Sequence, residues 1–170
     1  MSALQINVSD LLSRPRAQKN LVIDEIYTDL VTSTASVVSD QPVHLDVTLE
    51  RIPDGIVVRG RVIAHWRGEC RLCTEPVEAD LDLPIGELFE LEPVEGETYP
   101  IVGLEIDLDQ VVRDTVLPEL PLAPACTGPA AEGCAGRAAE ITASVVNEPD
   151  PRWAVLSQLT PEASASPRSN

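Results

Sequence analysis

The chain is poor in aromatic residues, and Lys19 is the only lysine among its basic residues. Aromatic side chains make up only 3% of the composition, so the core must be aliphatic and few rings can stack on nucleic-acid bases. No apolar run approaches the roughly 18 residues that a membrane-spanning helix requires. The first ten residues also lack the charged and apolar regions of a secretory signal. We therefore expect a cytoplasmic protein with no membrane partner.

Recognisable catalytic motifs are equally scarce. The sequence contains neither a glycine-rich phosphate loop nor a G-x-S-x-G nucleophile turn. Its two histidines, His44 and His65, fall on the polar faces of expected strands, and its many carboxylates show no acid–base or metal spacing. The sequence indicates a protein that is not an enzyme and has no small-molecule substrate.

Negative charge, by contrast, is abundant and unevenly distributed. The net charge is −16, and residues 69–109 hold thirteen acidic residues and a single basic one, which makes this acidic segment −12. Such a field repels phosphate and attracts Lys/Arg-rich proteins, so a basic partner is expected. An acidic face that only maintains solubility is the alternative. The candidate partner-binding residues on the acidic face are Glu87, Glu90, Glu92, Glu95 and Glu97.

Alternation between an apolar and a more polar face predicts three consecutive strands. It runs through residues 43–50, 56–67 and 77–85, and short turns between such strands predict an antiparallel β-meander. An amphipathic helix follows, with Asp107 as its N-cap and Pro118 at its end. Residues 21–26 suit a strand or a helical turn, and residues 32–42 are expected to be a polar connection. The expected fold class is α+β.

Composition divides the chain into four segments. Residues 1–125 form the expected α+β core, and residues 126–149 are an Ala/Gly-rich segment that is a candidate half of a zinc ribbon. Asp150-Pro151 is typical of a helix start, so residues 150–160 are expected to form a short C-terminal docking helix. The Ser/Ala/Pro-rich residues 161–170 are expected to be a disordered tail.

Cys70 and Cys73 form a C-x-x-C pair at the tip of the hairpin between the second and third expected strands. Two thiols at a hairpin tip are typical of a zinc knuckle, and a tetrahedral site needs two further ligands. Cys126 and Cys134 are the remaining thiols, so the four cysteines are the candidate ligands of a structural zinc ion. Two alternatives stay open. The thiols are reduced and unligated, or Cys70 and Cys73 are a redox pair, which would need a βαβ setting.

The polar face of the second expected strand carries three arginines, Arg59, Arg61 and Arg67. Taken alone, this stripe is a candidate RNA contact. Pairing with the third strand brings three carboxylates to the same face, where ion pairs would cancel much of the positive potential. These carboxylates belong to Glu78, Asp80 and Asp82. A charge-paired solvent face is favoured, and a direct RNA-binding module is the alternative.

Six short stretches, taken in their order along the chain, carry a family resemblance. They are INVSDLL (6–12), GECRLCTEPV (68–77), GELF (86–89), IDLDQVVRDTV (106–116), LPELPL (117–122) and DPRWAVL (150–156). No single stretch is specific, but the ordered set resembles the YceD-like family of large ribosomal RNA subunit accumulation proteins.

The resemblance implies a non-enzymatic role in 23S ribosomal RNA accumulation and ribosome assembly, with a ribosomal protein or a pre-ribosomal particle as partner. It also implies a neighbouring gene for a basic zinc-ribbon ribosomal protein, and it implies no catalytic residue. Similar family members often carry a cysteine-richer segment after the proline run. Here that segment contains only Cys126 and Cys134, without a further C-x-x-C pair.

Overall fold

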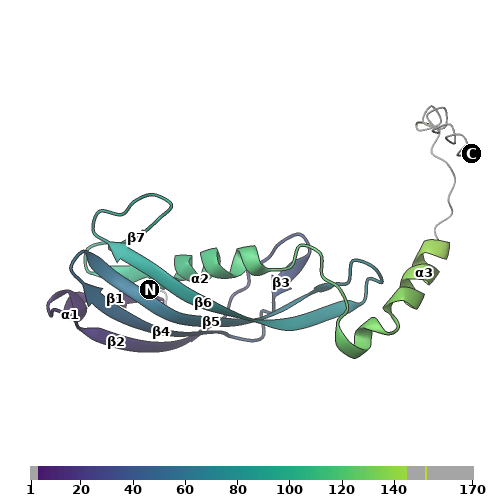
Figure 1. The fold of residues 1–170 in the computed structure, drawn as a ribbon, viewed down its shortest axis with the longest axis horizontal. Helices are drawn as coiled ribbons and strands as arrows, with labels where there is room; N and C mark the ends of the chain where they lie inside the picture. Colours follow the sequence, from purple (N-terminus) through teal and green to yellow (C-terminus); the bar gives the residue numbers. More distant parts are fainter. Residues whose placement is uncertain (1–3, 145–151, 153–170) are drawn as a thin grey trace, which may run out of the picture.

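The three alternating segments form the centre of a curved sheet in the computed structural model, which describes residues 4–144 and Arg152 (Figure 1). They are β4 (Val43–Ile52), β5 (Gly55–Glu69) and β6 (Pro76–Glu90), and neighbours along the chain pair antiparallel. The β5–β6 register is continuous, from Gly55 opposite Glu90 to Glu69 opposite Pro76. The predicted α+β class and the antiparallel meander are confirmed.

Three further strands extend this sheet. β2 (Gln18–Glu25) pairs antiparallel with β4, β3 (Ala35–Val37) pairs with the end of β5, and β7 (Tyr99–Pro100) runs parallel to the end of β6. The main path of the sheet is β2-β4-β5-β6-β7. Residues 21–25 are thus strand, and β3 lies inside the expected polar connection. Its three residues are too few to show an alternating pattern, and it forms by pairing with β5.

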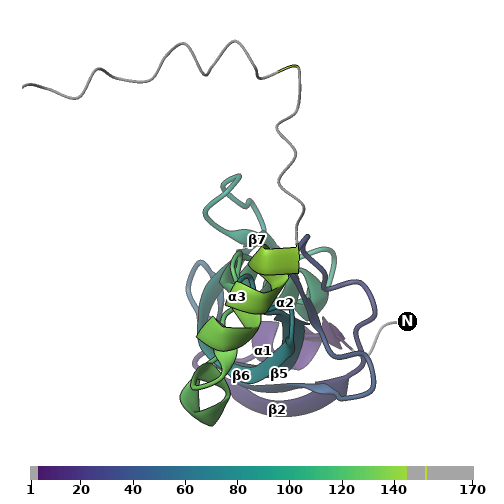
Figure 2. The ribbon, with the colours of Figure 1, turned by 90° about the vertical axis from the view of Figure 1, so that its right-hand side faces the viewer.

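A second layer covers the concave face of the sheet. It contains α2 (Leu108–Val116), the short strand pair β1 (Gln5–Asn7) and β8 (Glu105–Asp107), and the single-turn helix α1 (Ser9–Leu12). Figure 2, a view along the long axis, shows the sheet curving around these elements. The α2 face buries Leu108, Val111, Val112 and Val116 in the aliphatic core. The predicted amphipathic helix is therefore confirmed.

The ends of α2 follow the expected signals. The Asp107 carboxylate accepts the Asp109 N–H at 2.9 Å, which makes Asp107 the N-cap. At the other end the chain passes into the 3-10 turn η1 (Leu117–Glu119), where Pro118 cannot continue the α-helical hydrogen bonds.

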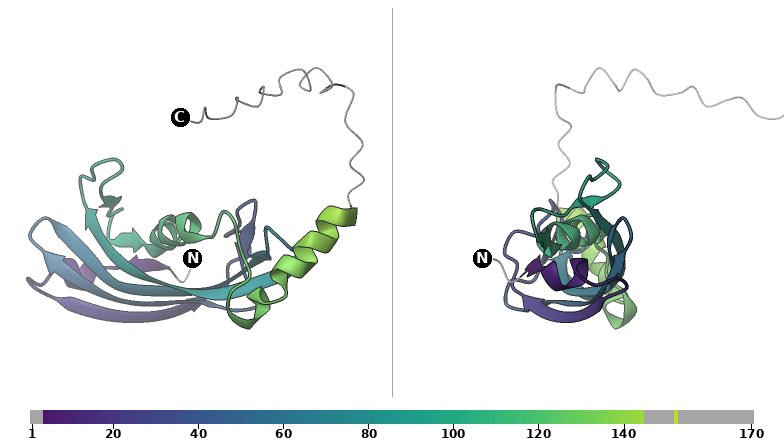
Figure 3. Two further views of the ribbon diagram at one scale, coloured as in Figure 1. Left: turned by 45° about the vertical axis from the view of Figure 1, so that its right-hand side comes forward. Right: turned by 90° about the vertical axis from the view of Figure 1, so that its left-hand side faces the viewer.

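The segment after the core contains two elements that the sequence pattern did not predict. These are the 3-10 turn η2 (Gly128–Ala131) and the helix α3 (Cys134–Ser144). Figures 1 and 3 show α3 at the end of the molecule opposite β7, beside the tip of the β5–β6 hairpin. The expected docking helix (150–160) and tail (161–170) lie outside the described residues, apart from Arg152. Among the described residues, no helix is long and apolar enough to cross a membrane.

Candidate metal centre

Four cysteine side chains from three separate segments meet at the tip of the β5–β6 hairpin. Cys70 and Cys73 lie in the turn between β5 and β6, Cys126 lies before η2, and Cys134 begins α3. The four sulfur atoms all lie within 4.8 Å of one another. The Cys70 and Cys134 sulfurs are 3.7 Å apart, and the Cys73 and Cys126 sulfurs are 3.5 Å apart. The structure thus brings all four predicted ligands together.

Backbone hydrogen bonds build this cluster. The Cys70 N–H donates to the Glu75 carbonyl at 2.8 Å, and the Thr74 N–H donates to the Cys70 carbonyl at 2.9 Å, which closes the turn. Thr74 adopts a left-handed φ of 57°, so the chain can reverse within this short turn. The Arg71 N–H donates to the Pro124 carbonyl at 2.8 Å. This last bond ties the segment before Cys126 to the turn that holds the C-x-x-C pair.

The environment divides the four thiols into two pairs. The backbone N–H groups of Cys73 and Leu72 lower the pKa of the Cys70 thiol to about 6, and the N–H of Glu75 lowers the pKa of Cys73. Burial raises the pKa of Cys126, and hydrogen bonding with Cys73 raises that of Cys134 to about 12. The backbone of the turn thus favours the thiolate form of Cys70 and Cys73, whereas the surroundings of Cys126 and Cys134 disfavour it.

The spacing and burial of the sulfurs fit a closed four-thiolate metal site. Tetrahedral Zn–S bonds of about 2.3 Å place sulfur atoms about 3.8 Å apart, close to the Cys70–Cys134 and Cys73–Cys126 separations. Cys70, Cys73 and Cys134 are buried and Cys126 is half-buried. A structural zinc site is closed in this way, whereas a catalytic site keeps one position open. The cluster is therefore suited to hold a metal ion.

The same geometry does not suit a dithiol redox centre. Cys70 contacts the Cys134 sulfur and Cys73 contacts the Cys126 sulfur, so each thiol of the turn has a close partner in the later segment. Cys70 and Cys73 also lie between antiparallel strands instead of at a helix N-terminus, and they are only 1% and 2% exposed. A redox thiol must be reachable by its substrate. The cluster favours ligation over exchange chemistry.

Arg137 contacts the cluster and was not identified from the sequence. Its Nη2 atom lies 3.8 Å from the Cys73 sulfur and donates to the Ala130 carbonyl at 3.2 Å. Its Nε atom lies 4.0 Å from a Glu75 carboxylate oxygen, on the turn. Because Arg137 follows Cys134 by three residues, both side chains share one face of α3. That spacing is the signal by which the sequence could have revealed it.

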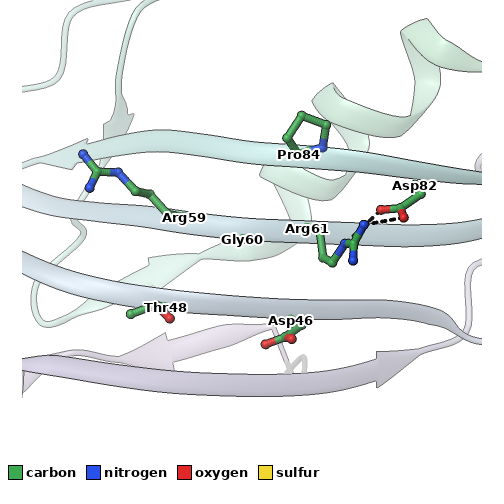
Figure 4. A pocket seen from close by; sticks show the side chains of 7 residues that line it. All are labelled: Asp46, Thr48, Arg59, Gly60, Arg61, Asp82 and Pro84. Atoms are coloured by element: carbon green, nitrogen blue, oxygen red, sulfur yellow. Dashed lines mark hydrogen bonds and ion pairs between the residues drawn. The ribbon is translucent and has the colours of Figure 1, made fainter.

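The three arginines of the predicted stripe lie on the outer face of the sheet, each in a different environment. Arg61 forms a two-point ion pair with Asp82, shown in Figure 4. Arg59 lies 4.0 Å from Glu50 of β4 and is largely exposed. Arg67 lies farther along β5, near the hairpin tip, opposite Ser36 and Glu78. The intervening His65 contacts Asp80 at 2.7 Å. The outer face around Arg61 and His65 is therefore charge-paired.

The five predicted acidic residues lie on different sides of the sheet end. Glu87 is opposite the buried Val58 and faces the α2 side, where it lines a hollow with Asp114 and Glu119. Glu90, an odd number of residues away, points to the other face. The remaining three, Glu92, Glu95 and Glu97, are exposed in the loop between β6 and β7. The loop thus exposes three of these five carboxylates to solvent.

Together, the fold and the cluster define a class of protein: a β-sheet scaffold with a four-cysteine centre at one end. The family model described as "Large ribosomal RNA subunit accumulation protein YceD" matches residues 58–160, more than half of the chain. The chain belongs to this YceD family.

Similar proteins occur in mycobacteria. Uncharacterized proteins of Mycobacterium bovis and Mycobacterium tuberculosis are each 30% identical over 174 residues, covering 93% of this chain and 82% of theirs. An uncharacterized protein of Mycobacterium leprae is 31% identical over 69% of this chain and 59% of its own. No solved structure matches.

Proposed function

We propose that the chain is a non-enzymatic cytoplasmic factor that supports 23S ribosomal RNA accumulation and ribosome assembly. The observation that carries this proposal is the family match over residues 58–160, because that family is described by large ribosomal RNA subunit accumulation. The thiol cluster supports a structural role for the cysteines, since three of the four are buried and two sulfur–sulfur contacts join the hairpin turn to the later segment.

The metal in this proposal is a structural zinc ion held by Cys70, Cys73, Cys126 and Cys134. Four thiolates with tetrahedral spacing are a donor set typical of zinc. Metal analysis of the purified full-length chain should find one zinc ion per chain. The Cys73→Ser variant should lose it, and Thr74→Ser, which changes the neighbouring side chain but no thiol, should keep it. Equal zinc content in both variants would reject the site.

The partner in this proposal is a basic ribosomal protein, alone or within a pre-ribosomal particle. The acidic segment supports this choice, since it holds −12 of the net −16 and its loop exposes Glu92, Glu95 and Glu97. Attraction between exposed charges weakens as salt shortens the Debye length. Ribosomal proteins should co-purify at about 0.05 M salt and be lost at about 0.5 M. Salt-insensitive binding, or recovery of no ribosomal protein, would contradict an electrostatic partner.

Direct rRNA binding through the arginine stripe has less support. Arg61 is already paired with Asp82, and the three carboxylates of β6 share the face with it. Filter binding with 23S rRNA fragments distinguishes direct rRNA binding from action through a protein partner. It compares the parent with the Arg59→Ala/Arg61→Ala double variant. A strong loss of affinity in the double variant would favour direct binding.

The cellular role is tested by deleting the gene and measuring the ratio of 23S to 16S rRNA. Deletion should lower this ratio, and the parent chain should restore it. Complementation with Cys73→Ser tests the thiol cluster, and complementation with Glu92→Gln/Glu95→Gln/Glu97→Gln tests the loop. An unchanged 23S to 16S ratio after deletion would reject the proposed function itself.

A further inference from the structure

β2 forms one border of the sheet, and its outer edge is open (Figure 1). Its inner edge pairs with β4 along its whole length. The Ala17 carbonyl accepts the Arg51 N–H at 2.9 Å, so the odd-numbered residues of β2 direct their backbone groups toward β4. The even-numbered residues from Gln18 to Asp24 therefore direct theirs outward. No described residue hydrogen-bonds to these outward backbone groups.

The two long borders of the sheet differ in how they are protected. Along β6 the open edge contains Pro84, which lacks an N–H, and carries a row of carboxylates. Proline and charge are devices that prevent a further strand from pairing. β2 has no proline, its charged residues Lys19, Asp24 and Glu25 lie toward its two ends, and at its centre Val22 is 65% exposed. The β2 edge is therefore the border that offers a template for another strand.

The sequence of β2 is complementary to itself when a second copy runs antiparallel. With a two-fold axis at Val22, Val22 lies opposite Val22 of the second copy in a hydrogen-bonded position, because its backbone groups point outward. In the same register Leu21 lies opposite Ile23 of the second copy, and Lys19 lies opposite Glu25 of the second copy. The side chains of these odd-numbered residues share one face, where Leu21 and Ile23 already pack against the core. The apolar layer thus continues across the junction, with an ion pair at each end.

Charge does not prevent this contact, although the whole chain is strongly acidic. Residues 13–25 carry three basic and two acidic side chains, so this border is +1. The acidic segment begins at the far side of the sheet, where β6 is separated from β2 by β4 and β5. Three strand spacings amount to about 14 Å. This exceeds the Debye length of about 8 Å at physiological salt, so repulsion from β6 is largely screened at the β2 edge.

We propose that two copies of this chain associate through antiparallel pairing of β2 with β2 about a two-fold axis at Val22. The pairing forms one continuous sheet with twofold symmetry. It leaves the four-cysteine cluster and the β6–β7 loop of each copy outside the contact. This inference does not depend on the proposed function in ribosome assembly.

A contact between two strands of eight residues is small and belongs to the weak class of interfaces. Sedimentation of the full-length chain from about 1 to about 500 µM therefore tests the association. Lys19→Glu and Glu25→Lys each place like charges opposite one another at both ends of the junction. Each single variant should raise the dissociation constant about tenfold. The double variant restores opposite charges and should return the constant to near the parent value. Failure of the double variant to recover would reject this register.

Val22→Pro removes an outward N–H without removing a bond to β4, and it should abolish dimer formation. Val22→Thr keeps the N–H and the branched shape, so it should retain the dimer. Urea unfolding of each variant verifies the fold, and the charge exchange remains decisive where Val22→Pro fails to fold. A parent chain that stays monomeric at every concentration overturns the proposal. A dimer that is indifferent to all of these substitutions overturns it as well.

Discussion

At the residue scale, Arg137 places a positive charge beside the thiol cluster. Its guanidinium lies 3.8 Å from the Cys73 sulfur. Four thiolates and one divalent ion carry a formal charge of −2, which a neighbouring guanidinium partly offsets. Arg137→Gln should therefore lower zinc affinity about tenfold, as loss of a group that supports metal ligands typically does. Transfer of zinc to a chromophoric chelator measures this change.

Arg71→Gln is the matched control for this prediction. Arg71 belongs to the same turn, but its side chain is exposed and its contribution to the cluster is the backbone hydrogen bond to Pro124. Zinc transfer from Arg71→Gln should match that of the parent. Equal transfer from the Arg137 and Arg71 variants would show that the guanidinium of Arg137 has no effect on the metal.

His65 makes stability depend on pH. Its Nδ1 atom lies 2.7 Å from Asp80 and its Nε2 atom 3.7 Å from Glu78, and the hydrogen bond to Asp80 raises its pKa above the usual 6.5. A raised pKa in the folded state means that the protonated imidazole stabilises the fold. This stabilisation is complete below the unfolded pKa and is lost as the pH rises through the folded pKa. His65→Gln should therefore be less stable than the parent at about pH 5.5, with a difference that shrinks toward about pH 9.

Urea unfolding at a series of pH values measures the His65 effect. In an Asp80→Asn background the pH dependence should be much smaller, because the main cause of the raised pKa is gone. A stability difference between parent and His65→Gln that grows with pH would contradict the assigned sign.

The residue types and spacing identified the candidate metal ligands, but not the contacts that bring Cys126 and Cys134 to the C-x-x-C turn. C-x-x-C at a hairpin tip is a local pattern, so Cys70 and Cys73 could be proposed from the sequence alone. The seven residues between Cys126 and Cys134 do not form a knuckle of their own. They join the cluster because Arg71 ties residue 124 to the turn and α3 begins at Cys134. Such contacts depend on the folded chain and leave no periodic signal.

At the element scale, the tight approach of β4 to β5 depends on Gly60. A Cβ atom at this position would lie 2.0 Å from the Asp46 carbonyl oxygen and 2.7 Å from the Val47 Cα, both in the backbone of β4. Backbone atoms within a paired sheet cannot move aside without separating the strands. Gly60→Ala should therefore destabilise the fold by about 2 kcal/mol or more, measured by urea unfolding.

Gly86→Ala is the control for Gly60. Gly86 lies on β6 opposite Arg59, the neighbour of Gly60, and a Cβ there would meet nothing within 4 Å. Its substitution should change stability by less than about 1 kcal/mol, and loss of flexibility in the unfolded chain favours a gain. Similar losses in both variants would show that the close approach at Gly60 does not determine the effect.

The helix α3 depends on the thiol cluster for its position. Its residues are mostly exposed, and its buried contact is Cys134, with Arg137 half-buried beside it. An isolated helix of this length is marginal in water. Removal of zinc by a chelator should therefore expose the amides of residues 134–144 to hydrogen exchange, while the amides of β4 and β5 stay protected. Unchanged protection of α3 after zinc removal, or equal loss throughout the sheet, would contradict this dependence.

The elements that could be predicted are those with a periodic pattern. β4, β5 and β6 alternate over long stretches, and α2 places Leu108, Val111 and Val112 on one face. β3, β7 and β8 are too short to show a period, and β8 forms by pairing with β1 across about a hundred residues of sequence. α3 lacks an apolar stripe, and it contacts the cysteine cluster through the Cys134 thiol and the Arg137 guanidinium. These elements follow from tertiary contacts that local composition does not record.

At the scale of the whole molecule, the uneven distribution of charge is the dominant feature. The acidic segment occupies β6, the loop that follows it, and the chain up to the first turn of α2, whereas the β2 border is close to neutral. The uneven charge can be counted from the sequence. The strand order that places the acidic segment and β2 on opposite borders of the sheet cannot be read from it. The molecule thus has one strongly acidic border, along β6, and one border that is close to neutral, along β2.

Self-repulsion within the acidic segment should lower stability in a salt-dependent way. Glu95→Gln/Glu97→Gln removes two exposed charges from the loop between β6 and β7, so it should raise the melting temperature by about 2 °C at about 0.02 M salt. The gain should disappear at about 0.5 M, where the Debye length is only a few ångströms. Asp40→Asn/Glu132→Gln is the control, because both residues are exposed and lie outside the acidic segment. Scanning calorimetry compares the two pairs. An equal gain from the control would indicate that net charge, and not its concentration beside β6, determines the effect.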